Sequence, residues 1–453
     1  MDCFVLRFVI SYMIMDNVLK NFIRYIGFNI LGQIAYGICI FADYWFISTA
    51  MGADGLAALS FALPVFSLTA GLGLMLGVGG GAKYAELRAG GDHHQANIIF
   101  TISITIGCLI LIPFIIIGLF FSTQTSMLLG ATGHILPMTD SYVKVALILS
   151  PGLILYLIFE SFVRNDDAPK VAMIASVTYS AMNIFWDYVF IIVFDWEMFG
   201  AALATTVASF FGLACLLVHW WRRKAAFRLV KTYLEIKQTV MICAIGAPPF
   251  VNELLYGFVL LAYNLVLFSL VGNIGVAAFG IVSSLGFIAQ NLFIGLGQGL
   301  QPMASHYYGK KDYHHLNKVL KYAVIMALSI AAITIAVIFL FTDPITSTLN
   351  SDQDAVLSEL ANDGIRIYFT AFLFFGVTIV AVAFLSVTAS QKTALMLSVF
   401  QGGALIIPLL VAMAHFWGVT GAWLSYPVSE LMLVIFSIFF IIANNKKIIN
   451  VCS

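Results

Sequence analysis

The chain has few charged residues for its length. Only 10% of its 453 residues are Asp, Glu, Lys or Arg, against about 25% in a soluble domain. No stretch between its hydrophobic runs is long and polar enough to form a soluble domain. The net charge is zero, so the chain lacks the basic excess of a nucleic-acid-binding protein, and no nucleic-acid partner is expected.

The sequence also lacks the usual signs of metal sites, disulfides and enzymatic catalysis. Its six cysteines form no CxxC pair and have no histidine at metal-ligand spacing, so neither a metal site nor a cofactor is expected. There is no HExxH, no GxSxG and no paired catalytic acid motif, which disfavours an intramembrane enzyme. The cysteines are Cys3, Cys39, Cys108, Cys215, Cys243 and Cys452.

Apolar residues are abundant instead. They make up 61% of the chain, with a mean hydropathy of +1.00. Runs near 20 residues recur, the length at which a helix crosses about 30 Å of hydrocarbon. Only helices satisfy their own backbone in lipid at this length, which predicts an all-α polytopic membrane protein with twelve transmembrane helices. The predicted spans are about 20–48, 56–83, 95–121, 139–163, 171–194, 198–221, 239–270, 276–305, 317–341, 359–387, 393–414 and 418–443.

One stretch of the chain occurs twice. Residues 271–317 match residues 51–97 at an offset of 220 without a gap, so that Gly77 meets Gly297 and Asp92 meets Asp312. A second match, WEMFGAAL from Trp196 and WGVTGAWL from Trp417, has an offset of 221. Because each half has six spans, both halves keep the same orientation. The repeat predicts two pseudo-symmetric six-helix bundles about an axis along the membrane normal.

These patterns divide the chain into five segments. The predicted segments are an N-terminal interfacial segment (1–19), an N-terminal six-helix lobe (20–221), a basic cytoplasmic linker (222–238), a C-terminal six-helix lobe (239–443) and a cytoplasmic tail (444–453). The first residues lack a small-residue cleavage site, so they do not resemble a removed signal peptide. The linker has two interpretations: a site for lipid or a partner, or an interfacial helix that fixes topology.

Basic residues give the orientation. With the N-terminus inside, only Lys144 and Arg366 of the 22 Lys and Arg residues lie near the outer face. This asymmetry follows the positive-inside rule. It predicts a multi-pass protein of the plasma (inner) membrane, a monomer in contact with lipid, with both termini in the cytoplasm.

Five acidic residues lie inside predicted spans, namely Asp43, Glu160, Asp187, Glu253 and Glu430. Each carboxylate costs at least about 2.5–3.5 kcal/mol at the bilayer centre, so such residues are expected to face a cavity or a partner. Glu160 lies four residues before Arg164, which predicts a structural ion pair along one helix. Glu430 has no obvious local partner in the sequence.

Two of these acids predict a common site. In span 5, Tyr179, Asn183 and Asp187 are spaced i, i+4, i+8 and form one polar stripe. Asp43 in span 1 and Thr205 in span 6 lie at the same outer level. The sequence therefore predicts a cluster that binds a proton or a small cation, and separate hydrogen bonding of each acid within helix packing is the alternative. The predicted cation-coupling residues are Asp43, Asn183, Asp187 and Thr205.

A second set of residues predicts contacts to substrate. Tyr36 lies seven residues before Asp43 on the same helix face, and Tyr256 follows Glu253 by three residues. The candidates for a substrate cavity are Tyr36, Tyr179, Glu253, Tyr256 and Gln290.

Several stretches resemble motifs of the multidrug and toxic compound extrusion (MATE) family. The stretch from Gln290 to Asn317 is similar to its span 8 signature, AMGADGLAALSFALPVF to its entry to span 2, and FESFVRNDDAPKVAM to its loop between spans 4 and 5. NIFWDYVFI and GAALATTVAS resemble its motifs in spans 5 and 6. Together these motifs cover the chain from about residue 20 to 443.

The resemblance implies two lobes around a central cavity and export of amphipathic, often cationic, small molecules by alternating access. It implies an antiporter driven by inward H⁺ or Na⁺, and it assigns the family's cation site to the same Asp43, Asn183, Asp187 and Thr205. Two positions depart from the family pattern. Gly27 stands where many members have proline, and Asp167 stands where glycine is usual.

Two other transporter classes share parts of this pattern. A lipid-linked oligosaccharide or lipid flippase of the same superfamily is the alternative function, but no Lys or Arg is expected in mid-membrane to meet an anionic lipid. A major facilitator transporter also has six plus six spans, but its basic motif after span 2 is not evident in KYAELRAGGDHH.

Overall fold

The computed structural model describes residues 17–222, 224–349, 354–388 and 391–452. Every regular element in this part of the chain is helical, which confirms the all-α fold. Residues 1–16 of the predicted interfacial segment lie outside the described residues.

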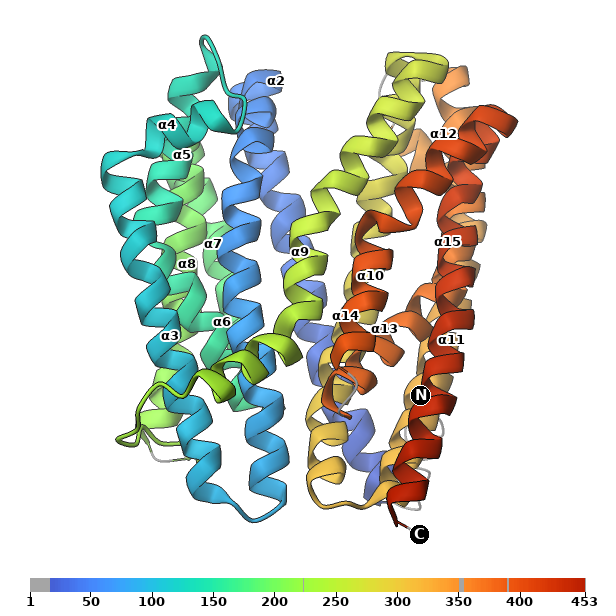
Figure 1. The fold of residues 1–453 in the computed structure, drawn as a ribbon. Helices are drawn as coiled ribbons and strands as arrows, with labels where there is room; N and C mark the ends of the chain where they lie inside the picture. The colour runs from blue at the N-terminus through green and yellow to red at the C-terminus, as the bar shows by residue number, and fades with distance from the viewer. Residues whose placement is uncertain (1–16, 223, 350–353, 389–390, 453) are drawn as a thin grey trace, which may run out of the picture.

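The first half of the chain forms a bundle that we call the N-lobe, and the second half forms the C-lobe; the two lie side by side in Figure 1. The N-lobe comprises α2 (Asn17–Ala89), α3 (His93–Phe120), α4 (Ser122–Leu128), α5 (Ile135–Ile148), α6 (Ser150–Asn165), α7 (Pro169–Asp187), η1 (Tyr188–Val193) and α8 (Glu197–Trp221). The C-lobe comprises α9 (Ile236–Val271), α10 (Asn273–Gly309), α11 (Tyr313–Leu349), α12 (Ala355–Tyr368), η2 (Phe369–Ala371), α13 (Phe372–Val387), α14 (Gln391–Val399), η3 (Phe400–Ala404) and α15 (Ile406–Cys452).

The helices account for twelve membrane crossings. In the described chain ten helices are long and apolar enough to cross a membrane, or eleven when the bent pair α5–α6 counts as one span. The segment Gln391–Ile442 has 52 residues, about 78 Å of helix, which is more than one crossing needs. It breaks at Gly418, where φ is 57° and ψ is −138°. This segment therefore supplies two crossings, in agreement with the prediction.

The two lobes repeat the same local geometry. Gly52 and Gly272, which the sequence aligns, have φ of 60° and 71°, a conformation open to glycine because it lacks a Cβ. Asp92 and Asp312 each accept a hydrogen bond from the backbone N–H three residues on, at 3.0 and 3.1 Å. We call the end of the molecule with Asp92 and Asp312 the lower end, and the end with Gly52 and Gly272 the upper end, as they appear in Figure 1.

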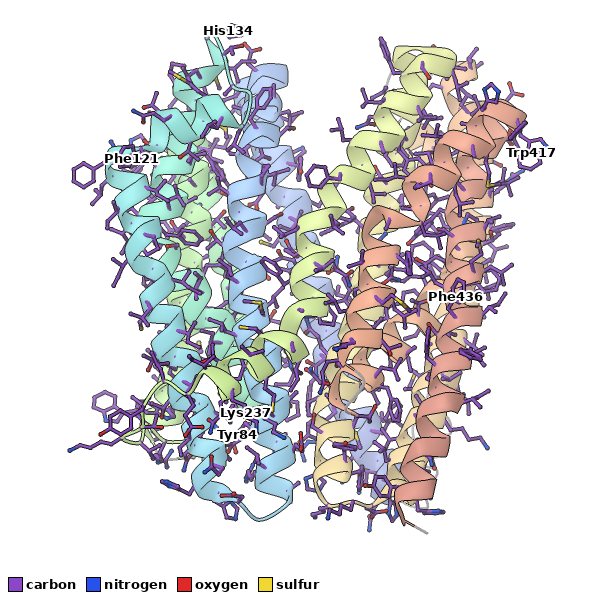
Figure 2. All side chains as sticks on the ribbon, in the orientation of Figure 1. Tyr84, Phe121, His134, Lys237, Trp417 and Phe436 are labelled. Carbon is purple, nitrogen blue, oxygen red and sulfur yellow. The ribbon has the colours of Figure 1, made fainter. Side chains whose placement is uncertain are left out.

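Large apolar side chains cover the outside of the bundle. Figure 2 shows Phe121, Trp417 and Phe436 pointing away from the helices. Their exposed fractions are 51%, 62% and 44%. Exposed aromatic surface of this kind is stable in contact with lipid, so the chain is a multi-pass integral membrane protein.

The linker between the lobes is not the interfacial helix that the sequence favoured. Residues 224–235 are non-helical and lie against the N-lobe, where Phe227 is fully buried with its ring 4.6 Å from that of Phe100. The predicted helix is absent because N-lobe side chains accept hydrogen bonds from the linker N–H groups. These bonds run from Ala226 to Asp166 (2.6 Å), from Arg228 to Asn97 (2.8 Å) and from Val230 to Thr101 (3.0 Å).

The lobes share apolar packing at the lower end. One core cluster belongs to the N-lobe and a second to the C-lobe, while a third joins them. In the third cluster, Phe22 and Ile26 of α2 belong to the same buried group as Leu300 and Met303 of α10. Apolar burial therefore holds the lower ends of the two lobes together.

Glycines, Gly246 and Gly309 among them, let the lobes approach backbone to backbone. A side chain on Gly246 of α9 would overlap the backbone of Met75 in α2, and one on Gly309 of α10 would overlap the backbone of Glu86. Because any larger residue would push these helices apart, the contact requires glycine. In this structure the lower end is closed.

We predict that Gly246→Val opens the lower end. Overpacking costs about 1–3 kcal/mol, so the ratio of closed to open molecules should fall roughly 5- to 150-fold. The ratio is measured from the distance between spin labels at Asn21→Cys and Lys310→Cys, with the other cysteines replaced. Gly257→Val in the same helix is the control, because a side chain there meets nothing within 4 Å. An unchanged distance distribution in Gly246→Val contradicts this account of closure.

Candidate functional site

The four residues predicted to bind a cation lie together in the N-lobe, and we call them the N-lobe acid site. Asp43 comes from α2, Asn183 and Asp187 from α7, and Thr205 from α8. The Asp43 carboxyl lies within hydrogen-bonding reach of both Asp187 and Asn183. The Asn183 side chain also donates to the Thr205 hydroxyl at 3.3 Å.

The N-lobe acid site is buried, so its stability depends on whether its two carboxyl groups are ionised. Asp187 is 1% exposed and Asn183 is fully buried. Within the described chain, one oxygen of Asp43 and both oxygens of Asp187 are buried without a hydrogen-bond donor. Two adjacent carboxylates repel each other in a low-dielectric site, so ionisation of both groups together is unfavourable.

Cys39 is a member of this site that the sequence analysis missed. Its thiol donates to the Asn183 side-chain oxygen at 2.6 Å, and the residue is fully buried. It lies four residues before Asp43, so it shares a helix face with that acid. This spacing was visible in the sequence, but the contact with Asn183 depends on how α2 packs against α7.

The two predicted tyrosines of the N-lobe have different surroundings. Tyr179 is 1% exposed and its ring stacks on Tyr156 at 5.4 Å, so it belongs to the N-lobe core. Tyr36 is partly exposed, and its ring lies 6.3 Å from that of Tyr179. The Tyr36 hydroxyl also lies within electrostatic range of Glu253 in α9 and of Asp43 in its own helix.

Glu253, Tyr256 and Gln290 lie in the C-lobe, apart from the N-lobe acid site. The Tyr256 ring packs 6.0 Å from Phe287, and the Gln290 amide donates to the Tyr426 hydroxyl at 3.4 Å. Glu253 is partly exposed, and among the described residues it has neither a hydrogen bond nor an ion pair.

Glu160 and Arg164 lie where the two lobes meet. Their charged groups are 3.7 Å apart, along one turn of α6. The Arg164 side chain is 1% exposed and donates to Gln298 of the C-lobe at 2.8 Å. Gln298 also accepts a hydrogen bond from Gln33 at 3.0 Å. The sequence indicated the pairing with Glu160 but not the bridge to Gln298, and this arginine is buried more deeply than was expected.

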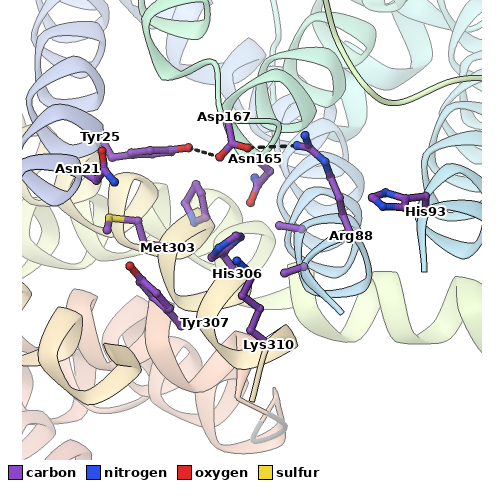
Figure 3. Close-up of a pocket in the computed structure, with 13 residues that line it drawn as sticks. Asn21, Tyr25, Arg88, His93, Asn165, Asp167, Met303, His306, Tyr307 and Lys310 are labelled. Atoms are coloured by element: carbon purple, nitrogen blue, oxygen red, sulfur yellow. Dashed lines mark hydrogen bonds and ion pairs between the residues drawn. The ribbon is translucent and has the colours of Figure 1, made fainter. Parts of the chain in front are cut away.

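Below these contacts, a pocket of about 290 Å³ lies between the lobes at the lower end. Figure 3 shows Tyr25, Arg88 and Asp167 of the N-lobe facing His306 and Lys310 of the C-lobe. The Tyr25 hydroxyl donates to Asp167 at 2.7 Å, and Arg88 lies 3.4 Å from the same carboxylate. Tyr25, Arg88 and Asp167 are therefore paired with one another within the N-lobe.

The backbone of the loop that contains Asp166 and Asp167 explains why Asp167 can stand where glycine is usual in the family. Asp167 has φ of 63°, the left-handed conformation that favours glycine and that aspartate tolerates better than most residues. Asp166 accepts hydrogen bonds from Tyr84 at 2.6 Å and Arg88 at 2.5 Å. Burial raises the pKa of the Asp166 carboxyl, although these two partners and the Ala226 N–H oppose the shift.

Comparison with protein families identifies this architecture. The MatE family model matches residues 29–189 and 248–411, which is most of both lobes. The chain belongs to the MATE family. Members of this family are transport proteins, so this MATE chain is a membrane transporter and not an enzyme.

Individual relatives and solved structures that resemble this chain are also multidrug exporters or MATE-like transporters by name. The multidrug export protein MepA of Staphylococcus aureus is 29% identical over 403 residues, which cover 88% of this chain and 87% of MepA. A multidrug resistance MATE transporter solved in an outward-facing conformation superposes with a TM-score of 0.89, at 19% identity over 96% of both chains. A Pyrococcus furiosus transporter of the MOP superfamily, whose pocket polarity is described as reversed, has a TM-score of 0.87, at 18% identity over 97% of both chains. The structural matches therefore define the fold of this MATE chain and leave its substrate open.

We predict that Gln298→Leu shifts this MATE chain towards conformations open at the lower end. The substitution leaves Arg164 without its partner across the lobes, and losing a hydrogen bond to a charged group costs about 1.5–3 kcal/mol. Gln298→Glu should have the opposite effect, because it places a carboxylate beside the guanidinium. The spin-label pair at positions 21 and 310 measures both. Equal distance distributions in the two variants contradict a closing role for this contact.

Proposed function

We propose that this MATE chain exports amphipathic, often cationic, small molecules, drugs among them, in exchange for H⁺ or Na⁺ moving inward. The N-lobe acid site is the observation that carries the proposal, because no ion pair among the described residues includes either of its two carboxyl groups. The similarity to MepA, a multidrug export protein, supports the substrate class.

The orientation of the chain in the membrane follows from the basic residues at its lower end. Lys20, Arg88, Lys237, Lys310 and Lys311 lie at this end, where the helices enter the two loops and the linker. We infer that the lower end faces the cytoplasm of a cell whose plasma membrane holds the chain. With that end closed, the structure represents an outward-facing state.

Coupling follows from the electrostatics of the N-lobe acid site. When the site is empty, repulsion between the carboxylates of Asp43 and Asp187 favours separation of α2 from α7. Binding of H⁺ or Na⁺ from outside removes this repulsion and lets the side chains pack as a neutral hydrogen-bonded cluster. The neutral N-lobe can then rearrange, release substrate outward and turn inward, where the ion leaves.

The surfaces of the two lobes that face each other supply the contacts to substrate. Tyr36 of the N-lobe lies within electrostatic range of Glu253, and Tyr256 lies on the same helix as Glu253. Aromatic rings and one carboxylate suit a lipophilic cation, which gains cation–π contacts and a counter-charge. An anionic lipid-linked substrate fits less well, because the buried Arg164 is already paired with Glu160 and Gln298.

We predict that Asp43→Asn and Asp187→Asn each uncouple export from the ion gradient. An amide mimics the neutral carboxyl group, so the variants should fold and bind substrate while gradient-driven export falls roughly 5- to 150-fold. The measurement is efflux of a cationic dye from proteoliposomes, with proton and sodium gradients imposed separately at equal protein density.

The exposed Asp54 at the upper end of α2 provides the control, and Asp54→Asn should export normally. If both site variants export at the wild-type rate with the same dependence on pH and Na⁺, the N-lobe acid site is not the coupling site. Glu253 is then the next candidate.

We predict that Glu253→Gln discriminates between substrates. Losing an interaction with a charged group costs about 1.5–3 kcal/mol, so the KM for a cationic dye should rise about tenfold or more. The KM for a neutral amphiphile of similar size should stay unchanged, because its aromatic contacts remain. An equal change for both substrates argues against Glu253 as the counter-charge.

A further inference from the structure

The linker between the lobes has one face packed on the N-lobe and one face uncovered. Ala225 and Phe227 belong to the buried core of the N-lobe. The uncovered face carries large apolar side chains, because Trp221 is 84% exposed, Tyr233 91% and Ile236 82%. Apolar groups exposed to this degree are unfavourable in water, so another surface is expected to cover them. We call the exposed side chains of the described residues from 221 to 240 the linker surface.

The linker surface is also strongly basic. Residues 221–240 contain six Lys and Arg residues and one acid, Glu235, which accepts a hydrogen bond from Gln238 at 2.8 Å. Among the described residues, no ion pair includes the exposed basic side chains of this surface. These side chains are Arg222, Lys224, Lys231 and Lys237. The surface therefore has an excess of positive charge that suits an anionic partner.

The contacts of the linker with α3 give its depth in the membrane. Asn97 and Thr101 of α3 accept hydrogen bonds from the linker backbone. They follow Asp92, which caps the lower end of α3, by five and nine residues, or about 8 and 14 Å at 1.5 Å per residue.

The length of α3 shows which part of the bilayer lies at that depth. The helix has 28 residues, about 42 Å, which exceeds the hydrocarbon thickness of about 30 Å by about 12 Å. Its polar stretch HHQAN comes first, so the excess lies at the lower end. The linker therefore runs along the boundary between the hydrocarbon and the headgroups.

The linker lies on the outside of the N-lobe. Figure 1 shows it passing from the lower end of α8 across α3 to α9, whose first turns lie across the bundle. The Gln238 amide of α9 also donates to Gln95 of α3 at 3.4 Å. A soluble protein cannot reach apolar side chains at this depth and on this side, whereas phospholipids already surround the protein there.

Hydrogen bonds fix the shape of the linker without a lipid. The Trp220 ring N–H and the Arg228 guanidinium both donate to the Phe227 carbonyl, at 3.1 and 2.9 Å. Together with the bonds from the linker backbone to the N-lobe, they hold the basic side chains at set positions along α3. A surface that is already ordered loses less conformational entropy when it binds a ligand.

We propose that the linker surface is a binding site for anionic phospholipids. Its lysines and arginines contact the phosphate headgroups, while Trp221, Tyr233 and Ile236 enter the start of the acyl chains. Lys and Arg near a membrane surface attract anionic lipids, and Trp and Tyr are enriched at the headgroup level. This inference goes beyond the proposed function and does not depend on the exported substrate or on the coupling ion.

The test is quenching of a bimane fluorophore on Tyr233→Cys, with the other cysteines replaced, in phosphatidylcholine nanodiscs that contain a small fraction of brominated lipid. Brominated phosphatidylglycerol should quench more strongly than brominated phosphatidylcholine at the same fraction, because each basic residue favours an anionic lipid roughly fivefold. Adding Lys231→Gln and Lys237→Gln should lower this preference at least about fivefold. The control pair, Lys321→Gln and Lys392→Gln, removes two exposed charges from the C-lobe and should leave the preference unchanged.

Three results overturn the proposal. The first is equal quenching by the two brominated lipids, and the second is a fluorophore that neither lipid quenches, as expected of a surface in water or beneath another protein. The third is a preference that persists in the Lys231→Gln, Lys237→Gln variant. Inorganic phosphate at constant ionic strength should leave the preference unchanged, and its loss would overturn the assignment to lipid in favour of a free phosphate site.

Discussion

A carboxyl group held away from water needs a partner, and this requirement accounts for much of the structure. Glu160 is balanced by Arg164 at 3.7 Å. Among the described residues, no ion pair includes Asp43, Asp187 or Glu430, and the Gln401 amide donates to Glu430. An acid with an arginine partner is stable as a buried ion pair, whereas burial of an acid without one favours its neutral form.

Lobe closure rests on contacts of a different kind. Apolar packing and the glycine contacts of Gly246 and Gly309 bring the lower ends together, and the bridge from Arg164 to Gln298 adds a polar contact. Both kinds of contact are lost if the lobes separate at this end. The N-lobe acid site lies inside a single lobe, so an ion acts on closure indirectly, by changing how the helices of one lobe pack.

The linker adds a constraint to any movement of the lobes. Phe227 is buried in the N-lobe, and three linker N–H groups bond to N-lobe side chains. Residues up to about 230 therefore move with the N-lobe, and the change of direction between lobes falls in the short stretch before Ile236. Asp166 accepts from both the linker and Arg88, so it connects the linker to the loop that lines the lower pocket.

The sequence alone determined the all-α fold, the twelve crossings and the two-fold repeat, because these follow from hydrophobic length and local periodicity. It also predicted the grouping of Asp43, Asn183, Asp187 and Thr205, since helical spacing and span direction fix their face and depth. Tertiary structure alone decided which acids have partners. Gln298 meets Arg164, and Gln401 meets Glu430, through contacts between helices far apart in the chain. The linker shows the same dependence on tertiary contacts: its composition suited an interfacial helix, but acceptors on the N-lobe bind its backbone in a non-helical form. Local patterns reveal periodicity along one helix, whereas pairing between helices depends on packing that no single segment encodes.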